Sequence, residues 1–235
     1  MKWRTFRNLM FHSLGIERCY KPRILIERPD IGECNQLEWA IASHLIDNQE
    51  FRFIQIGAFD GRTCDALHRA ITRFGLKGVL VEPQSSAFAR LSETYRDQPQ
   101  LKLINAAVST ESGVRSLYTV RGESSLVASF DRQHLLKHGI ARNQIDSEEV
   151  HCITMEELVE AAGGHVDLVQ IDTEGHDFEI LQSINVSRLK PQIIRYEQLH
   201  MTRRQRDEAA SRLADLGYRL ITDKMDALCY LDRAA

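Results

Sequence analysis

Five side chains able to carry acid–base or metal chemistry lie close together in the stretch DLVQIDTEGHDFEIL, residues 167–181. They follow an apolar run and are Asp172, Glu174, His176, Asp177 and Glu179. Carboxylates and imidazoles act as proton acceptors or donors, and both also bind metal ions. Acids are equally at home in the first turn of a helix, where they offset its dipole. We expect Asp172 and Glu174 to face a site, Asp177 and Glu179 to begin a helix, and His176 to be a reserve candidate.

The elements that must position these residues alternate between strand and helix from residue 51 onward, which is typical of a parallel sheet covered by helices. Apolar runs predict main strands at 51–57, 78–83, 101–109, 167–172 and 191–199 and closing strands at 218–222 and 227–232. An additional strand is predicted at 114–120, and residues 121–149 at first sight form a long loop with some helix over a binding site. Thr154 and Glu157 have the spacing of a capping box at a helix start.

Polar groups gather where these strands end, and ligands of an open parallel sheet bind outside the carboxyl ends of its strands. The groups that follow the five main strands are Gly57-Ala58-Phe59-Asp60-Gly61, Glu82, Asn105 to Ala107, Asp172 to His176, and Glu197 to His200. The turn at Gly57 lacks the G-x-G-x-x-G pattern that cradles a diphosphate. Glu82, about 25 residues later, can accept hydrogen bonds from ribose hydroxyls. Together these features favour a nucleoside cofactor of the adenosine type without a diphosphate.

Four motifs in this order, IGAFDGRTCDAL, GLKGVLVEPQ, VDLVQIDTEGHDFEIL and KPQIIRYEQLHM, resemble those of the FkbM-type methyltransferases, and the resemblance covers about residues 51–232. This family is a branch of the class I methyltransferase fold that uses S-adenosylmethionine. The resemblance implies an α/β fold with three layers, a doubly wound, Rossmann-like and mostly parallel seven-stranded sheet whose last strand is antiparallel. It also implies methyl transfer, commonly to an oxygen. The chain departs from the family at Gln55, where many members carry Asp.

The resemblance and the strand ends together name the candidate site residues. Those expected to bind the cofactor are Gln55, Gly57, Ala58, Asp60, Gly61, Glu82, Pro83, Ala107, Ser125 and Asp172. For Asp60, bonding to the cofactor and capping of the next helix both stay open. An alkyl hydroxyl needs a base, and the expected catalytic residues are His200, Asp172 and Glu174, of which His200 has an ordinary pKa near neutrality. A divalent metal stays open, with Asp172, Glu174 and Glu197 as its ligands.

Composition excludes several classes of protein. A hydrophobic fraction of 43%, a charged fraction of 27% and a net charge of -3 suit a globular protein and argue against a nucleic-acid partner. Five scattered cysteines without a C-x-x-C pair favour a reduced, cytoplasmic setting, and no apolar run is long enough for a transmembrane segment.

Residues 1–50 are predicted to be an N-terminal helical appendage, and residues 51–235 the S-adenosylmethionine-dependent methyltransferase domain. Residues 1–28 carry seven Lys and Arg against two Glu, a net +5. A helix there could pack on its own domain, on a partner subunit in a homo-oligomer, or on a membrane surface as a peripheral contact.

We therefore expect an S-adenosylmethionine-dependent methyltransferase that methylates a hydroxyl of a sugar, glycan or natural-product intermediate, with a small molecule or a glycan as acceptor. One alternative is N-methylation of another acceptor. Another is a non-catalytic module that scaffolds a biosynthetic complex.

Overall fold

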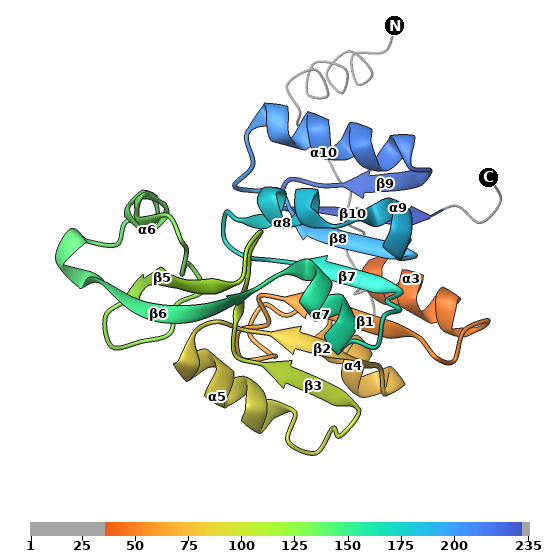
Figure 1. Ribbon diagram of the computed structural model, residues 1–235, viewed down its shortest axis with the longest axis horizontal. Coiled ribbons are helices and arrows are strands. Elements are labelled where there is room, and N and C mark those ends of the chain that lie inside the picture. Colours follow the sequence, from red (N-terminus) through yellow and green to blue (C-terminus); the bar gives the residue numbers. More distant parts are fainter. Residues whose placement is uncertain (1–35, 232–235) are drawn as a thin grey trace, which may run out of the picture. The chain divides into compact units, whose positions relative to one another are not determined.

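The computed structural model describes residues 36–231 and is built on one large sheet (Figure 1). Its strands are β1 (Arg52–Ile56), β2 (Lys77–Val81), β3 (Leu101–Ile104), β7 (Leu168–Ile171), β8 (Ile193–Glu197), β9 (Tyr218–Thr222) and β10 (Asp226–Leu231). They lie in the order β3-β2-β1-β7-β8-β10-β9, and only β10 pairs antiparallel with its neighbours. The predicted seven-stranded, mostly parallel sheet with an antiparallel last strand is confirmed.

Helices cover both faces of this sheet, so the domain has three layers (Figure 1). One face packs against α3 (Gln36–Leu45), α4 (His68–Phe74) and α5 (Ser85–Thr94), and the other against α7 (Met155–Ala161), α8 (Asp177–Ser183), α9 (Val186–Leu189) and α10 (Arg203–Asp215). Alternate side chains of β1 point to opposite faces of the sheet. Phe53 packs in the core with α3, α4 and α5, and Ile54 packs in the core with α7 to α10. Both are fully buried, and burial of such a side chain contributes about 1.5–3 kcal/mol.

The strand order reverses between β1 and β7, which are neighbours in the sheet although β2 and β3 lie between them in the sequence. Connections from these two strands leave in opposite directions, so a crevice opens between their carboxyl ends. The turn after β1 begins with Gly57, and the turn after β7 begins with Asp172. The topology therefore brings the two motifs with the strongest chemical signal to one place.

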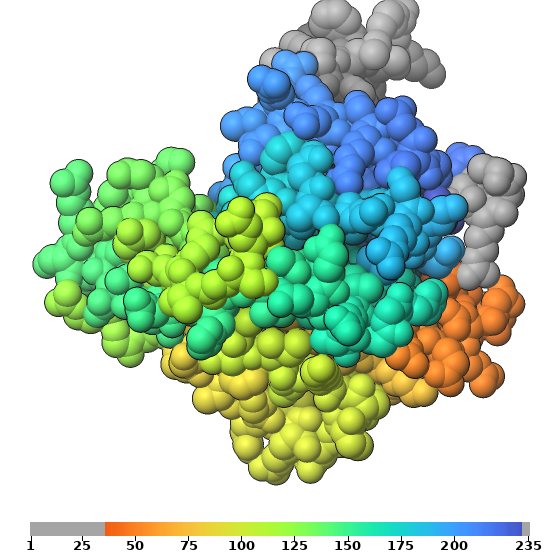
Figure 2. Space-filling model, viewed as in Figure 1, coloured from red at the N-terminus to blue at the C-terminus, as the bar shows by residue number. Residues whose placement is uncertain are grey.

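A second, three-stranded sheet stands beside the large one. It contains β4 (Ala107–Val108), β5 (Gly113–Val120) and β6 (Ile145–Ile153) in the order β4-β6-β5, with α6 (Arg132–Lys137) and a short 3-10 helix (Arg142–Gln144) between β5 and β6. The space-filling view shows these residues as a lobe that projects from the body of the domain (Figure 2).

Two predicted boundaries in this region are wrong. The single strand predicted at 101–109 is broken, because Asn105 Nδ2 donates to the backbone oxygens of Glu82 (2.8 Å) and Pro83 (3.0 Å). The chain then leaves the large sheet, and Ala107 pairs with Cys152 of β6. The loop predicted at 121–149 ends early, since β6 already begins at Ile145.

Part of the predicted N-terminal appendage is visible as α3. Its Leu37 and Ile41 are buried in the same core as Phe51 and Phe53, so residues 36–45 pack on the domain. The basic residues 1–28 and the membrane or subunit contact predicted for them lie outside the described residues. Among residues 36–231, none of the helices has both the length and the apolar character that a membrane span requires.

Candidate active site

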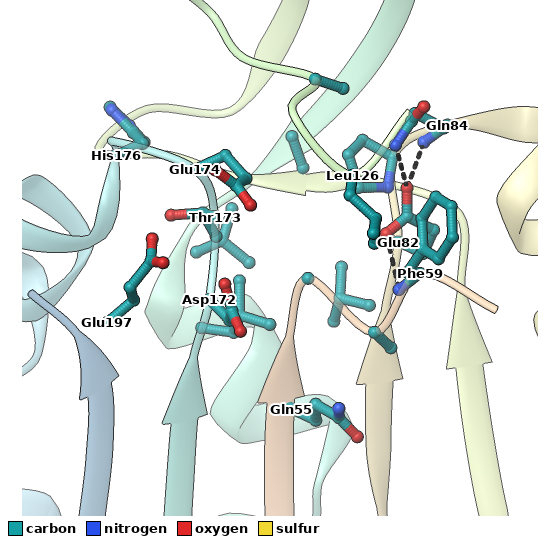
Figure 3. Close-up of a pocket in the computed structure, with 18 of the residues that line it drawn as sticks. Gln55, Phe59, Glu82, Gln84, Leu126, Asp172, Thr173, Glu174, His176 and Glu197 are labelled. Atoms are coloured by element: carbon teal, nitrogen blue, oxygen red, sulfur yellow. Dashed lines mark hydrogen bonds between the residues drawn. The ribbon is translucent and has the colours of Figure 1, made fainter. Parts of the chain in front are cut away.

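A cavity of about 350 Å³ opens at the carboxyl ends of β1, β2, β7 and β8, as expected from the reversal of strand order. Its floor is formed by the strand ends, and an apolar roof comes from Leu117 of β5 and from Leu126, Ala128 and Phe130 of the loop between β5 and α6. Figure 3 shows Glu82 and Phe59 on one side of this space, and Asp172, Glu174 and Glu197 on the other. The predicted residues that line the cavity are Gln55, Gly57, Ala58, Glu82, Pro83, Ala107, Ser125, Asp172, Glu174, His176 and Glu197.

The turn after β1 is fixed by contacts within the protein. Gly57 has a φ of 81°, and a Cβ on it would lie 1.8 Å from the backbone oxygen of Asp172. The backbone N–H groups of Gly57 and Ala58 both donate to the oxygen of Val81 at 3.0 Å. Gly57 is thus required by the close approach of the two central turns, in a conformation that glycine adopts without steric cost.

Asp60 and Gly61 lie in the same turn but outside the lining of the cavity. The carboxylate of Asp60 accepts bonds from the backbone N–H groups of Arg62 (2.9 Å) and Thr63 (2.7 Å) and from the Thr63 hydroxyl. A Cβ on Gly61 would meet the Leu91 and Tyr95 side chains of the α5 region. In this structure both residues shape the turn, and their contact with a cofactor stays a prediction.

Glu82 ends β2 and is only 2% exposed. Its Oε2 accepts from Phe59 N at 2.9 Å, and its Oε1 accepts from Gln84 N at 2.8 Å and from Gln84 Nε2 at 3.3 Å (Figure 3). Burial raises the pKa of Glu82 to about 7, and these N–H donors oppose the rise because they favour the charged form. The Gln84 amide also exchanges two hydrogen bonds with the Ser125 backbone, so it ties the loop after β5 to this edge of the cavity.

Three polar side chains form a buried floor beneath the turn. Gln55 Nε2 donates to Asp65 Oδ1 at 2.9 Å, and Gln55 is the register partner of Gln170 on β7. The remaining acceptors Gln55 Oε1, Asp65 Oδ2 and Gln170 Oε1 are buried without a hydrogen-bond partner. Such groups are costly to bury unless something bonds to them, so three in one wall of a cavity mark a place for a donor.

Three carboxylates crowd the other side of the cavity, where Asp172, Glu174 and Glu197 each place an oxygen within 4.8 Å of the others. Burial raises the pKa of Asp172 to about 7, and the charges of Asp177 and Glu174 add to the effect. Burial and then the Asp172 charge raise the pKa of Glu197 to about 9. Like charges this close cannot all be ionised at neutral pH without a counter-charge, so the cluster retains protons.

The turn that presents Glu174 is held by Asp177. Asp177 is buried, its Oδ1 accepts from Thr173 N at 3.1 Å, and its Oδ2 accepts from Gly175 N at 3.2 Å. Between these bonds Glu174 has a φ of 53°, and its backbone oxygen accepts from Ser129 Oγ at 2.9 Å. The expected role of Asp177 at the helix start is therefore incomplete, because its side chain fixes a strained backbone at the site.

His200, expected as the base, lies behind Glu174 and outside the lining of the cavity. Its Nε2 is 3.2 Å from Glu174 Oε2 and 3.7 Å from Glu197 Oε2. Burial lowers the pKa of His200, and His134 lowers it further. His176 does line the cavity, with its ring against Phe130 at 5.5 Å between centroids.

Sequence reasoning missed several residues of the site, among them His134, which is buried with its Nε2 3.2 Å from Glu174 Oε2. His138 directly follows α6, four residues after His134, and its ring is 5.3 Å from that of His200. The H-x-x-x-H spacing of these two residues was a usable signal, because it places two imidazoles on one face of a helix. The acceptors Asp65 and Gln170 gave no local signal of this kind.

Comparison with known proteins agrees with this architecture. The model of the methyltransferase FkbM domain matches residues 55–220, while no curated protein matched the chain. A crystal structure of methyltransferase FkbM from Methylobacillus flagellatus KT is 12% identical with a TM-score of 0.49, and the match covers 77% of this chain and 43% of that one. The chain thus spans less than half the length of that protein.

Two further solved structures match over nearly their whole length. The SAH-bound methyltransferase PaMTH1 of Podospora anserina is 10% identical with a TM-score of 0.42, and the match covers 99% of this chain and 97% of that one. A putative caffeoyl-CoA O-methyltransferase from Staphylococcus aureus is 12% identical with a TM-score of 0.43, over 97% of this chain and 98% of that one. On the extent of the family match, the chain belongs to the FkbM methyltransferase domain family.

Proposed function

We propose that this member of the FkbM methyltransferase family uses S-adenosylmethionine to methylate a hydroxyl group of a sugar, glycan or natural-product intermediate. When bound, this cofactor supplies an electrophilic methyl group on a sulfonium. The observation that carries the proposal is the pair of polar ends of the cavity, one with the Glu82 carboxylate and the other with three unpartnered acceptors.

The Glu82 end suits a nucleoside. A carboxylate offers about four acceptor positions, and the protein uses three of those on Glu82, so capacity remains for a ribose hydroxyl. Ala107 and Leu126 beside it line the cavity with apolar surface that suits a purine ring. The donors from Phe59 and Gln84 hold the carboxylate in place before any ligand arrives.

The floor suits the amino-acid end of the same molecule. An ammonium group has three N–H donors, and Gln55 Oε1, Asp65 Oδ2 and Gln170 Oε1 are three acceptors that have no partner within the protein. A cation there would also stabilise the charged form of Asp65, whose pKa burial raises. Gln55 thus fills the place of the family's usual Asp, while Asp65 supplies the negative charge.

The carboxylates on the β7 side are suited to take the proton that an alcohol must lose. Asp172 and Glu174 both line the cavity, and a pKa of about 7 places Asp172 in the range that serves a general base near neutral pH. Glu174 contacts His200 and His134, so without a metal bound to these residues a proton accepted by Glu174 can pass to an imidazole outside the cavity. His200 then acts through Glu174 and does not touch the acceptor itself.

Calorimetry on the full chain tests the proposal. S-adenosylmethionine and its demethylated product are expected to bind with one site per chain, and Asp65→Asn, which removes the charge of the floor, is expected to weaken both. Arg219→Lys on the far strand β9 is the matched control and should bind as the wild type does. If no heat of binding is measured at millimolar ligand, the methyltransferase proposal is wrong and the alternative of a non-catalytic scaffold module takes its place.

A screen with a labelled methyl donor then identifies the acceptor class. Sugars, glycans and hydroxylated small molecules are expected to take up label, whereas matched amines are not. Label transferred only to amines would replace O-methylation by N-methylation while the cofactor assignment stood.

A further inference from the structure

Behind the carboxylates of the cavity lies a cluster of three imidazoles and one carboxylate: His134, His138, His200 and Glu174. One ligand atom from each lies within 4.8 Å of the others. The rings stand 4.5–5.3 Å apart between centroids. They come from three separate segments: α6 with the residue that follows it carries His134 and His138, and the turns after β7 and β8 carry Glu174 and His200.

The spacing of the cluster is that of metal ligands. Nitrogen and oxygen ligands lie about 2.0–2.1 Å from Zn²⁺, so two ligands of a tetrahedral site are about 3.4 Å apart. His134 Nε2 and His200 Nε2 are each 3.2 Å from Glu174 Oε2. The His138 side chain is exposed and can turn to complete the set.

The local backbone leaves room for these rings. Gly175 follows Glu174, and a Cβ on it would lie 3.4 Å from His134 Nδ1 and 3.9 Å from the Cβ of His200. Asp177 and Ser129 hold the turn so that Glu174 points between the two rings. Buried groups outside the cluster therefore fix the position of its central ligand, which is the usual support of a metal site.

We propose that His134, His138, His200 and Glu174 form a binding site for one divalent transition-metal ion of the Zn²⁺ class. Three imidazoles with one carboxylate suit Zn²⁺, Co²⁺ or Ni²⁺, whereas Mg²⁺ and Ca²⁺ require oxygen ligands. The all-oxygen group Asp172, Glu174 and Glu197 is the competing arrangement, and it shares only Glu174 with the proposed site.

An ion in this site would lie at the border of the cavity, because Glu174 lines the cavity and the three histidines do not. Its charge would favour the ionised forms of Glu174 and Glu197, both of which stand beside His200. Any consequence of this charge for methyl transfer rests on the proposed function. Binding of the ion itself does not.

The test is a metal titration of the full chain, produced without a histidine tag and stripped with a chelator. Zn²⁺ is expected to bind at one equivalent, and Co²⁺ is expected to give the visible absorption of an imidazole-ligated ion. The double variant His134→Ala/His138→Ala should lower the affinity at least about a hundredfold, since loss of a mere supporting residue already costs 10–100-fold. The single variant His138→Ala, which alters an exposed side chain, should lower it less.

Three comparisons keep the result interpretable. His151→Ala removes an exposed histidine of β6 and should leave the titration unchanged. Thermal unfolding in chelator should be similar for wild type and His138→Ala, so that lost binding is not lost folding. Unchanged affinity in the double variant, or loss of binding in Asp172→Asn with retention in the double variant, would overturn the proposal. Calorimetry of S-adenosylmethionine on the metal-free chain reports separately on the proposed function.

Discussion

The carboxylate at the end of β2 and the carboxylates after β7 and β8 face one cavity in opposite surroundings. Glu82 is surrounded by N–H donors from Phe59 and Gln84. Asp172, Glu174 and Glu197 face one another, and Glu197 Oε2 is buried without a hydrogen-bond partner. Donors that surround a charge fix its place in advance, whereas crowded acids hold protons that can be exchanged. The first arrangement suits binding and the second suits proton transfer.

The turns after β1 and β7 meet where Gly57 contacts the backbone of Asp172, and disrupting this contact has the largest expected effect. Gly57→Ala would place a Cβ 1.8 Å from the Asp172 oxygen at a φ of 81°. We expect a loss of about 4 kcal/mol or more in the free energy of unfolding, as for other severe steric conflicts in a core. Urea denaturation measures it.

Gly75→Ala is the matched control for this prediction. Gly75 also has a positive φ, at 63°, but a Cβ on it would meet nothing within 4 Å. Only the left-handed backbone opposes this change, at a cost of about 1–2 kcal/mol. Equal losses of unfolding free energy in the two variants would show that the contact between Gly57 and Asp172 is not tight.

Asp172→Asn tests whether the carboxylates after β7 and β8 serve proton transfer. It keeps the shape of the side chain and removes its capacity to take a proton, so turnover is expected to fall by about 10²–10⁴-fold. Affinity for S-adenosylmethionine, measured by calorimetry, should change little. A parallel fall in affinity and turnover would assign Asp172 to binding instead.

Glu82→Gln probes the binding side. The amide retains one acceptor oxygen but brings N–H donors against those of Phe59 and Gln84, so cofactor affinity is expected to fall about tenfold, by roughly 1.4 kcal/mol. Turnover at saturating cofactor should stay near that of the wild type.

The same residue predicts a pH dependence of binding. With a pKa of about 7, Glu82 is protonated below neutrality, and a protonated carboxyl accepts hydrogen bonds less well than a carboxylate. Wild-type affinity is therefore expected to fall as the pH drops from 8 to 6, and the Gln variant should show no such fall. Calorimetry at three pH values distinguishes the two profiles.

Glu197→Gln is expected to change how the free energy of unfolding of the metal-free chain depends on pH. A pKa of about 9 in the folded state lies above the ordinary value of 4.5. Between these values the folded chain keeps a proton that the unfolded chain has released, so the free energy of unfolding falls as the pH rises. Without this group the decline between pH 6 and 8 should be smaller, by at most about 2.7 kcal/mol for one proton over two pH units. Identical slopes would place the retained proton elsewhere in the cluster.

The large sheet was predictable from the sequence because its signals are local. Apolar runs marked the strands, and the capping box predicted at Thr154 and Glu157 is confirmed with both of its hydrogen bonds. The break at Asn105 was not predictable, because its side chain bonds to backbone oxygens 22 and 23 residues away. A strand that reads as continuous is interrupted there by a partner that spacing does not reveal.

The site divides in the same way. Glu82 and Asp172 were found because each directly follows an apolar run that ends at the cavity. His134 lies in a segment without clear periodicity and meets Glu174 40 residues later in the chain. Asp60 and Gly61 have the right place in the motif, yet their side of the turn faces Thr63 and Tyr95 instead of the cavity. Position along the chain predicts which turn a residue occupies and leaves open the direction it faces.

The second sheet has a consequence for the order in which parts of the molecule open. Its core holds only the four buried residues Ala107, Leu117, Val150 and Cys152, and β4 contributes just two residues to its pairing. Regions with so few buried contacts exchange their amide hydrogens through local opening, and the free energy of this opening is well below that of global unfolding. We expect the amides of β5 and β6 to exchange before those of β1 and β7. Because β5 and the loop that follows it line the cavity, this local opening would loosen one wall of the ligand site.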